Sequence, residues 1–198
     1  MAVTTVFLDR DGVINENRPD HVKSWSEFQF LPGAPEAVAR LSQAGARVFV
    51  ITNQAIINRG MVSRETVDAI NQQMVGAINE RGGRIDEVAY CPHRPEEQCS
   101  CRKPRPGLLL EIARKYGIEL KETVVIGDAL TDVEAALVAG CQAILVLTGR
   151  GSEQLEMATA MGKNGFVVAA DLGAATEFLL HELVPSFEGD SGATSEYT

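Results

Sequence analysis

Short apolar runs rich in β-branched residues alternate with amphipathic stretches of helical periodicity along almost the whole chain. This alternation is typical of a parallel β-sheet, because each crossover between parallel strands needs a long connection, usually a helix. The near-continuous hydrophobicity of the runs predicts strands that helices cover on both faces. We therefore expect an α/β protein with a Rossmann-like parallel sheet. The six predicted strands are 3–8, 47–52, 85–90, 123–126, 143–147 and 166–169.

Glycines, prolines and capping residues indicate where the intervening helices begin and end. The first three helices are predicted within 33–45, 63–83 and 106–117. Thr131 and Glu134 fit a capping box at the start of a fourth helix that ends at Gly140. Ser152 and Asp171 are candidate N-caps of two more helices.

A chain of 198 residues is long enough to bury one full core without disulfide support. We expect one domain over residues 1–184 and a disordered polar tail over 185–198. The 27 acidic and 18 basic side chains give a net charge of −9. This charge disfavours binding to nucleic acid and requires any anionic ligand to meet a local basic patch.

Membrane insertion and export are not expected. The longest strongly apolar stretch, 135–149, is too short to span a bilayer, and the apolar residues 2–8 run directly into charged residues. Three of the four cysteines crowd into 91–101, which favours metal ligation in a reducing cytoplasm over disulfides. We therefore expect a cytoplasmic protein, and of its possible assemblies we favour the monomer.

Two carboxylates follow the first predicted strand. Alternation along an extended chain places Asp9 and Asp11 on one side and Arg10 on the other. Ligands of parallel sheets bind in the crevice at the carboxyl ends of the strands. A carboxylate pair there suits Mg²⁺, and an ionised Asp can attack phosphorus while its neighbour protonates the leaving oxygen. The alternative is a polar turn, for which Asp and Gly are ordinary residues.

Hydrogen-bonding side chains also end the second strand. Thr52, Asn53 and Gln54 are candidates for holding phosphate oxygens, although Thr and Asn often bond their own backbone at strand ends. Lys103 lies in a loop just before a predicted helix, where it can neutralise a nucleophile and a phosphoryl group together. The alternative for Lys103 is a solvated basic loop.

The fourth strand ends in a further carboxylate. Asp128 would add a third carboxylate to a shared cation, and Asp132, one helical turn later, would support it. Asp132 also suits the first turn of a helix, where the helix dipole favours a negative charge.

Together these residues resemble the motifs of the haloacid-dehalogenase-like phosphatases. The matching positions are Asp9-x-Asp11, Thr52-Asn53, Lys103 and Gly127-Asp128-x-x-x-Asp132, and the resemblance covers residues 3–150. It implies that Asp9 becomes an aspartyl-phosphate and that Asp11 is first a general acid and then a base. It also implies Mg²⁺ held by Asp9, Asp128 and the backbone carbonyl of Asp11, with Thr52 and Lys103 binding the phosphoryl group.

The loop 91–106 fits neither the helical nor the strand period. It contains four soft or borderline metal ligands in two close pairs, which suit one tetrahedral structural Zn²⁺: Cys91, His93, Cys99 and Cys101. A disulfide or a redox pair agrees less well with this spacing. Because Cys101 directly precedes Arg102 and Lys103, a bound zinc ion would also fix the basic residues.

A zinc loop followed by Arg-Lys-Pro resembles the branch that contains D-glycero-D-manno-heptose 1,7-bisphosphate 7-phosphatases and histidinol-phosphate phosphatases. The loop is too short for a cap domain, so an open site for a small phosphorylated substrate is implied. Arg59-Gly60 and the Pro-x-Pro-Gly at 104–107 favour the heptose enzymes. Arg59 and Arg102 would then grip the second phosphate of a sugar bisphosphate. The chain departs from that pattern at Ile56, usually Gly, and at Ala129, usually Lys.

Three other functions remain open from the sequence. Histidinol phosphate would be hydrolysed by the same chemistry. A polynucleotide 3′-phosphatase shares the fold but needs a basic groove, which the acidic composition disfavours. A zinc-stabilised binding module without catalysis is possible, although every position required for phosphoryl transfer is filled.

Overall fold

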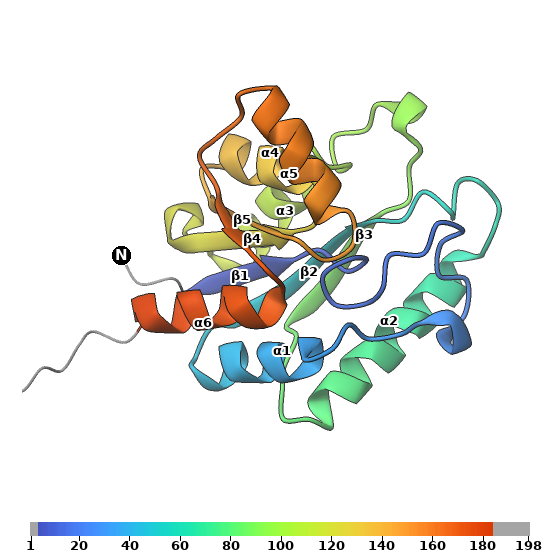
Figure 1. Ribbon diagram of the computed structural model, residues 1–198. Coiled ribbons are helices and arrows are strands. Elements are labelled where there is room, and N and C mark those ends of the chain that lie inside the picture. The colour runs from blue at the N-terminus through green and yellow to red at the C-terminus, as the bar shows by residue number, and fades with distance from the viewer. Residues whose placement is uncertain (1–3, 184–198) are drawn as a thin grey trace, which may run out of the picture.

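Six parallel strands form one sheet in the order β3-β2-β1-β4-β5-β6 (Figure 1). The computed structural model describes residues 4–183, so the predicted tail, 185–198, lies outside the described residues. The strands are β1 Thr5–Leu8, β2 Arg47–Asn53, β3 Glu87–Cys91, β4 Thr123–Gly127, β5 Gln142–Val146 and β6 Val167–Ala169. They confirm the predicted α/β sheet, with ends that differ from the predicted ones by at most two residues.

Helices cover both faces of the sheet. In Figure 1, α1, α2 and α6 lie below it, and α3, α4 and α5 lie above it. Their bounds are α1 Ala34–Gln43, α2 Arg64–Asn79, α3 Gly107–Tyr116, α4 Leu130–Ala139, α5 Gly151–Ala160 and α6 Leu172–Leu183. Short 3₁₀ turns occur at Trp25–Glu27, Pro95–Glu97 and Leu120–Glu122. Among residues 4–183, no helix has the length and apolar content needed to cross a membrane.

The strand residues alternate between two cores. Val6 and Leu8 of β1 pack with α1, α2 and α6, whereas Phe7 packs with α3 and α4. Phe7 stacks on Phe49 of β2, with ring centroids 5.2 Å apart. Because both faces are buried, neither side of a central strand tolerates polar residues, which explains the apolar runs in the sequence.

Two of the predicted helix starts are wrong. Helix α4 begins at Leu130, and Asp132 rather than Thr131 or Glu134 caps it, because an Asp132 oxygen accepts the Ala129 N–H at 3.1 Å. Helix α5 begins at Gly151, so Ser152 lies inside it instead of capping it. The predicted cap of α6 is present, since Asp171 Oδ1 accepts the Ala174 N–H at 2.8 Å.

The strand order reverses direction between β1 and β4. Chain connections run one way from β1 through β2 to β3 and the other way from β4 through β5 to β6. Their helices therefore diverge at this point and leave a crevice beyond the carboxyl ends of β1 and β4. The register pairs Leu8 with Ile126, so the residues that follow both strands meet across the crevice.

Candidate active site

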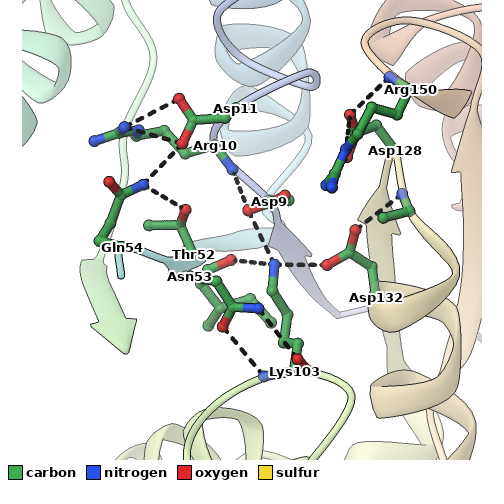
Figure 2. A network of polar contacts seen from close by, with 12 residues as sticks. Asp9, Arg10, Asp11, Thr52, Asn53, Gln54, Lys103, Asp128, Asp132 and Arg150 are labelled. Carbon is green, nitrogen blue, oxygen red and sulfur yellow. Dashed lines mark hydrogen bonds and ion pairs between the residues drawn. The ribbon is translucent and has the colours of Figure 1, made fainter. Parts of the chain in front are cut away.

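Asp9, the first residue after β1, lies at the centre of the crevice (Figure 2). Its backbone N–H continues the sheet by donating to the Ile126 carbonyl at 2.9 Å. Its Oδ1 accepts the Arg10 backbone N–H at 2.8 Å and pairs with Lys103 Nζ at 2.9 Å. The sheet and two donors therefore fix this carboxylate in one orientation.

Lys103 lies between two carboxylates. Its Nζ is 2.6 Å from Asp132 Oδ1 and also donates to the Ile51 carbonyl at 2.8 Å. Burial alone would lower the pKa of this ammonium, but the charges of Asp132 and Asp9 outweigh it and raise the pKa above its usual value. Lys103 therefore remains a cation although only 3% of it is exposed.

Burial raises the pKa of Asp9 to about 6, and the charges of Asp132 and Asp11 add to the rise while Lys103 opposes it. The pKa of Asp128 is raised by burial and then by the charge of Asp9, and the pKa of Asp132 is also raised, chiefly by burial. These shifts identify a buried group of negative charges that additional positive charge would stabilise.

The Asn53 side chain holds the loop that carries Lys103. Asn53 Oδ1 accepts the Lys103 N–H, and Asn53 Nδ2 donates to the Lys103 carbonyl, both at 3.2 Å. Both ends of the amide are thus used on the Lys103 backbone, whereas the sequence suggested phosphate oxygens as its partners. Thr52 is buried beside it, and its Oγ1 accepts a hydrogen bond from Gln54 Nε2 at 2.9 Å.

The Arg10 side chain lies against Asp11. The expectation that Arg10 points to the side opposite Asp9 and Asp11 is therefore wrong. Its NH2 donates to both Asp11 oxygens, at 2.9 and 3.0 Å, and its NH1 donates to Asn71 Oδ1 at 3.1 Å. Asn15 Nδ2 and Gln54 Nε2 donate to the same carboxylate at 2.9 and 2.8 Å. Burial would raise the pKa of Asp11, but Arg10 and these amides lower it below its usual value.

The carboxylates of Asp9, Asp128 and Asp132 form one cluster, with an oxygen of each lying within 4.8 Å of the others. An all-oxygen set of buried carboxylates suits a hard divalent cation such as Mg²⁺. Asp128 additionally pairs with Arg150, whose NH2 is 3.2 Å from Asp128 Oδ1. Two glycines make room for this carboxylate, because a Cβ on Gly12 or Gly149 would lie 2.1 or 2.3 Å from Asp128 Oδ2.

A cavity of about 370 Å³ opens over Asp9, Asp11 and Lys103. Arg59 and Arg102, predicted to bind a second phosphate, both line it. Arg59 NH1 is 3.1 Å from His21 Nε2, and Arg102 NH1 donates to the His93 carbonyl at 3.2 Å. Burial and the Arg59 charge lower the pKa of His21, so its neutral imidazole can accept from the guanidinium.

The four predicted zinc ligands gather at the end of β3. Cys91, Cys99 and Cys101 Sγ atoms lie 3.3 to 3.5 Å apart, and His93 Nδ1 lies 3.3 Å from Cys101 Sγ. A tetrahedral ion about 2.3 Å from each sulfur would hold the sulfurs about 3.8 Å apart. The cysteines are free, and Cys141 lies apart from them in the apolar core. The donor set and spacing fit Zn²⁺.

Sequence reasoning missed the roles of Arg10, His21 and Arg150. Arg150 follows β5 just as the predicted site residues follow the neighbouring strands, so the strand-end rule would have found it. His21 carries no such signal, because it lies in an irregular loop between β1 and α1. Its φ of 63° is uncommon for residues other than glycine, although histidine adopts it more readily than most.

Comparison with known proteins identifies a matching family model and close relatives of this chain. A family model described as HAD-hydrolase-like matches residues 100–175. The D-glycero-beta-D-manno-heptose-1,7-bisphosphate 7-phosphatase of Bordetella bronchiseptica is 42% identical over 177 residues, which are 89% of this chain and 98% of that protein. The Pseudomonas aeruginosa protein of the same name is 40% identical over 183 residues, 91% of this chain and 99% of its own.

A solved structure agrees with these relatives. The crystal structure of D,D-heptose 1,7-bisphosphate phosphatase from B. bronchiseptica, complexed with magnesium and phosphate, matches with a TM-score of 0.86 and 42% identity. The match covers 92% of this chain and 99% of that one.

Proposed function

Because this chain belongs to the D-glycero-beta-D-manno-heptose-1,7-bisphosphate 7-phosphatase family of HAD-like hydrolases, we propose that it removes the 7-phosphate of that sugar bisphosphate. The observation that carries the proposal is the position of Asp9. It is a buried carboxylate at the switch point of the sheet, held by Lys103 at the floor of a cavity that arginines line. This arrangement supports a phosphomonoesterase that works through an aspartyl-phosphate.

In the proposed reaction, an Asp9 oxygen attacks the phosphorus of the 7-phosphate and the bond from phosphorus to the sugar oxygen breaks. Asp11, which must be protonated for this first step, supplies the proton that the leaving sugar oxygen takes. Water then attacks the aspartyl-phosphate, Asp11 accepts the proton from that water, and Asp9 and inorganic phosphate are released. The four hydrogen bonds that Asp11 accepts suit its ionised form, which is the form needed in this second step.

The site residues around Asp9 have separate proposed tasks. Lys103 neutralises charge on Asp9 and on the transferring phosphoryl group, and Thr52 binds a phosphoryl oxygen. Asn53 and Gln54 are positioning residues. Asn53 holds the Lys103 backbone, and Gln54 holds the Asp11 carboxylate.

Mg²⁺ is the proposed cofactor. Asp9, Asp128 and the backbone carbonyl of Asp11 would hold it, and Asp132 would support this set through Lys103. When bound, the ion would reduce the repulsion between the nucleophile and the phosphate. The raised pKa values of Asp9 and Asp128 support a cation at this place. The Bordetella relative holds magnesium and phosphate in its crystal structure.

Zn²⁺ is proposed for the loop 91–106, bound by Cys91, His93, Cys99 and Cys101. The ion would have a structural task. Arg102 donates to the His93 carbonyl, so clamping the loop would also hold the arginine that faces the cavity.

Three cysteines clustered as candidate metal ligands favour a reducing compartment, so we propose a cytoplasmic protein. We further propose that it is a monomer with one catalytic domain over residues 1–184.

A screen of phosphate release tests the proposed function. The substrates are both anomers of the heptose 1,7-bisphosphate, heptose 7-phosphate, histidinol phosphate and a 3′-phosphorylated oligonucleotide, each with Mg²⁺. We expect kcat/KM to be highest for a heptose bisphosphate, since that ratio measures discrimination directly. A preference for histidinol phosphate would reassign the substrate, and no release from any of them would favour a non-catalytic module.

A further inference from the structure

The loop after β5 forms part of the site, although no sequence motif identified it. Thr148 Oγ1 donates to the Gly12 carbonyl at 2.6 Å and so ties this loop to the one that carries Asp11. Gly149, at a φ of 57°, lies so close that a Cβ there would be 2.6 Å from the Gly12 Cα. These contacts bring Arg150 directly against Asp128.

Arg150 holds Asp128 in two different ways. Its backbone N–H donates to Asp128 Oδ2 at 2.9 Å, and this bond belongs to the fixed loop. Its guanidinium lies across the same carboxylate, with NH2 3.2 Å from Oδ1 and Nε 3.5 Å from Oδ2 (Figure 2). The side chain is 52% exposed whereas Asp128 is fully buried. The guanidinium can therefore leave Asp128 without disturbing the backbone bond.

Solvent exposure distinguishes Arg150 from the other cations that touch these carboxylates. Arg10 and Lys103 are 1% and 3% exposed and are committed to Asp11 and to the pair Asp9 and Asp132. Arg150 is long, half exposed and lines the same cavity as Asp9. It is the cation of this group with both the freedom to move and a route to a phosphate placed over Asp9.

A divalent cation in this cluster would take an oxygen of Asp128, and the guanidinium lies against both of them, with NH2 3.2 Å from Oδ1 and Nε 3.5 Å from Oδ2. The two must therefore compete. A guanidinium that loses Asp128 remains in the cavity, where a phosphate dianion offers bidentate hydrogen bonds.

We infer that Arg150 is a shared cation of this site, exchanged between Asp128 and the phosphate of the substrate, and that a divalent cation on Asp128 drives the exchange. The inference rests on the proposed phosphatase function. It makes Arg150 a phosphate-binding residue and couples metal loading to phosphate affinity.

Binding measurements on Arg150→Gln test the inference. Mn²⁺ affinity is measured by electron paramagnetic resonance in metal-free protein, and inorganic phosphate affinity by calorimetry in Mg²⁺-loaded protein. Removing the competitor should tighten Mn²⁺ about 5-fold or more. Removing the guanidinium should weaken phosphate about 10-fold or more. Arg114→Gln is the control, because it removes the same charge from an exposed position on α3 away from the cavity.

Both changes are required. Mn²⁺ affinity that stays the same or falls, phosphate affinity that stays the same, or equal changes in Arg114→Gln would each overturn the inference. Failure of the proposed function would look different, because the wild-type protein would then bind both ions without hydrolysing the bisphosphate.

Discussion

At the scale of single residues, the site depends on a lysine whose charge is shared. Lys103 pairs with Asp9 at 2.9 Å and with Asp132 at 2.6 Å. A buried ammonium left without a partner costs about 3–5 kcal/mol, whereas one that keeps a carboxylate partner costs far less. Asp132 can thus keep Lys103 charged while Asp9 carries a phosphoryl group.

This sharing predicts the behaviour of Asp9→Asn. The amide has nearly the same shape and cannot attack phosphorus, so phosphate release should fall by at least ~10³-fold. The protein should remain folded because Lys103 still pairs with Asp132. Steady-state kinetics and thermal unfolding check both statements, with the exposed Glu111→Gln as control. Near-normal turnover in Asp9→Asn would exclude Asp9 as the nucleophile.

Arg59 is the residue on which substrate preference is expected to depend. It lines the cavity, and His21 orients its guanidinium. If Arg59 grips the second phosphate, Arg59→Ala should lower kcat/KM for the heptose bisphosphate more than for heptose 7-phosphate. The difference should be about 1–3 kcal/mol for a charge-assisted pair. Equal losses on the two substrates would show that Arg59 does not contact the second phosphate.

Sequence patterns predicted the site residues whose positions are fixed by a strand end or a helix start. They missed contacts that depend on how loops fold against one another. Asp9, Asp128 and Lys103 were predicted because strand ends and a loop before a helix fix their positions. Arg10 was misplaced because strict alternation fails once the strand ends at Leu8 and a loop begins. Asn53 and Gln54 have the predicted location but bond protein atoms, a choice that depends on neighbours far away in sequence.

At the scale of elements, the loop 91–106 links a candidate zinc site to the cavity. Arg102 contacts the His93 carbonyl, and Asn53 at the end of β2 holds the Lys103 backbone. The loop is therefore held at one end by the candidate metal ligands and at the other by the sheet.

Cys99→Ser tests this element. Replacing a thiolate ligand with a hydroxyl should lower zinc content well below one ion per chain, since structural zinc affinity depends on the complete ligand set. Activity should fall in parallel, because the loop that positions Arg102 and Lys103 is released. Elemental analysis and phosphate release on the same preparations measure both. Cys141→Ser should keep its zinc, and full activity in zinc-free protein would contradict the link.

The elements themselves were largely predictable because the central strands β1, β2, β4 and β5 are buried on both faces and glycines such as Gly117 and Gly140 end helices. The start of α4 was misread because Thr131 and Glu134 mimic a capping box, whereas the side chain that caps the helix belongs to Asp132. Tertiary contacts favoured Asp132, which also pairs with Lys103.

At the scale of the molecule, an acidic protein concentrates basic residues where its sheet order reverses. The net charge is −9, yet arginines at 18, 59, 102 and 150 and Lys103 line one cavity. Segments that follow β1, β2, β3 and β5 deliver these groups, because the carboxyl ends of parallel strands lie at one edge of the sheet. The whole-molecule field repels polyanions, while the local field favours a small phosphorylated ligand.

Phosphorus NMR of the wild-type protein acting on heptose 1,7-bisphosphate with Mg²⁺ tests the central claim most directly. The account predicts that the 7-phosphate signal disappears, that inorganic phosphate rises in equal amount, and that the 1-phosphate signal persists, because the phosphate over Asp9 is transferred and the remote one is only bound. Loss of the 1-phosphate first, or no loss of either, would contradict it.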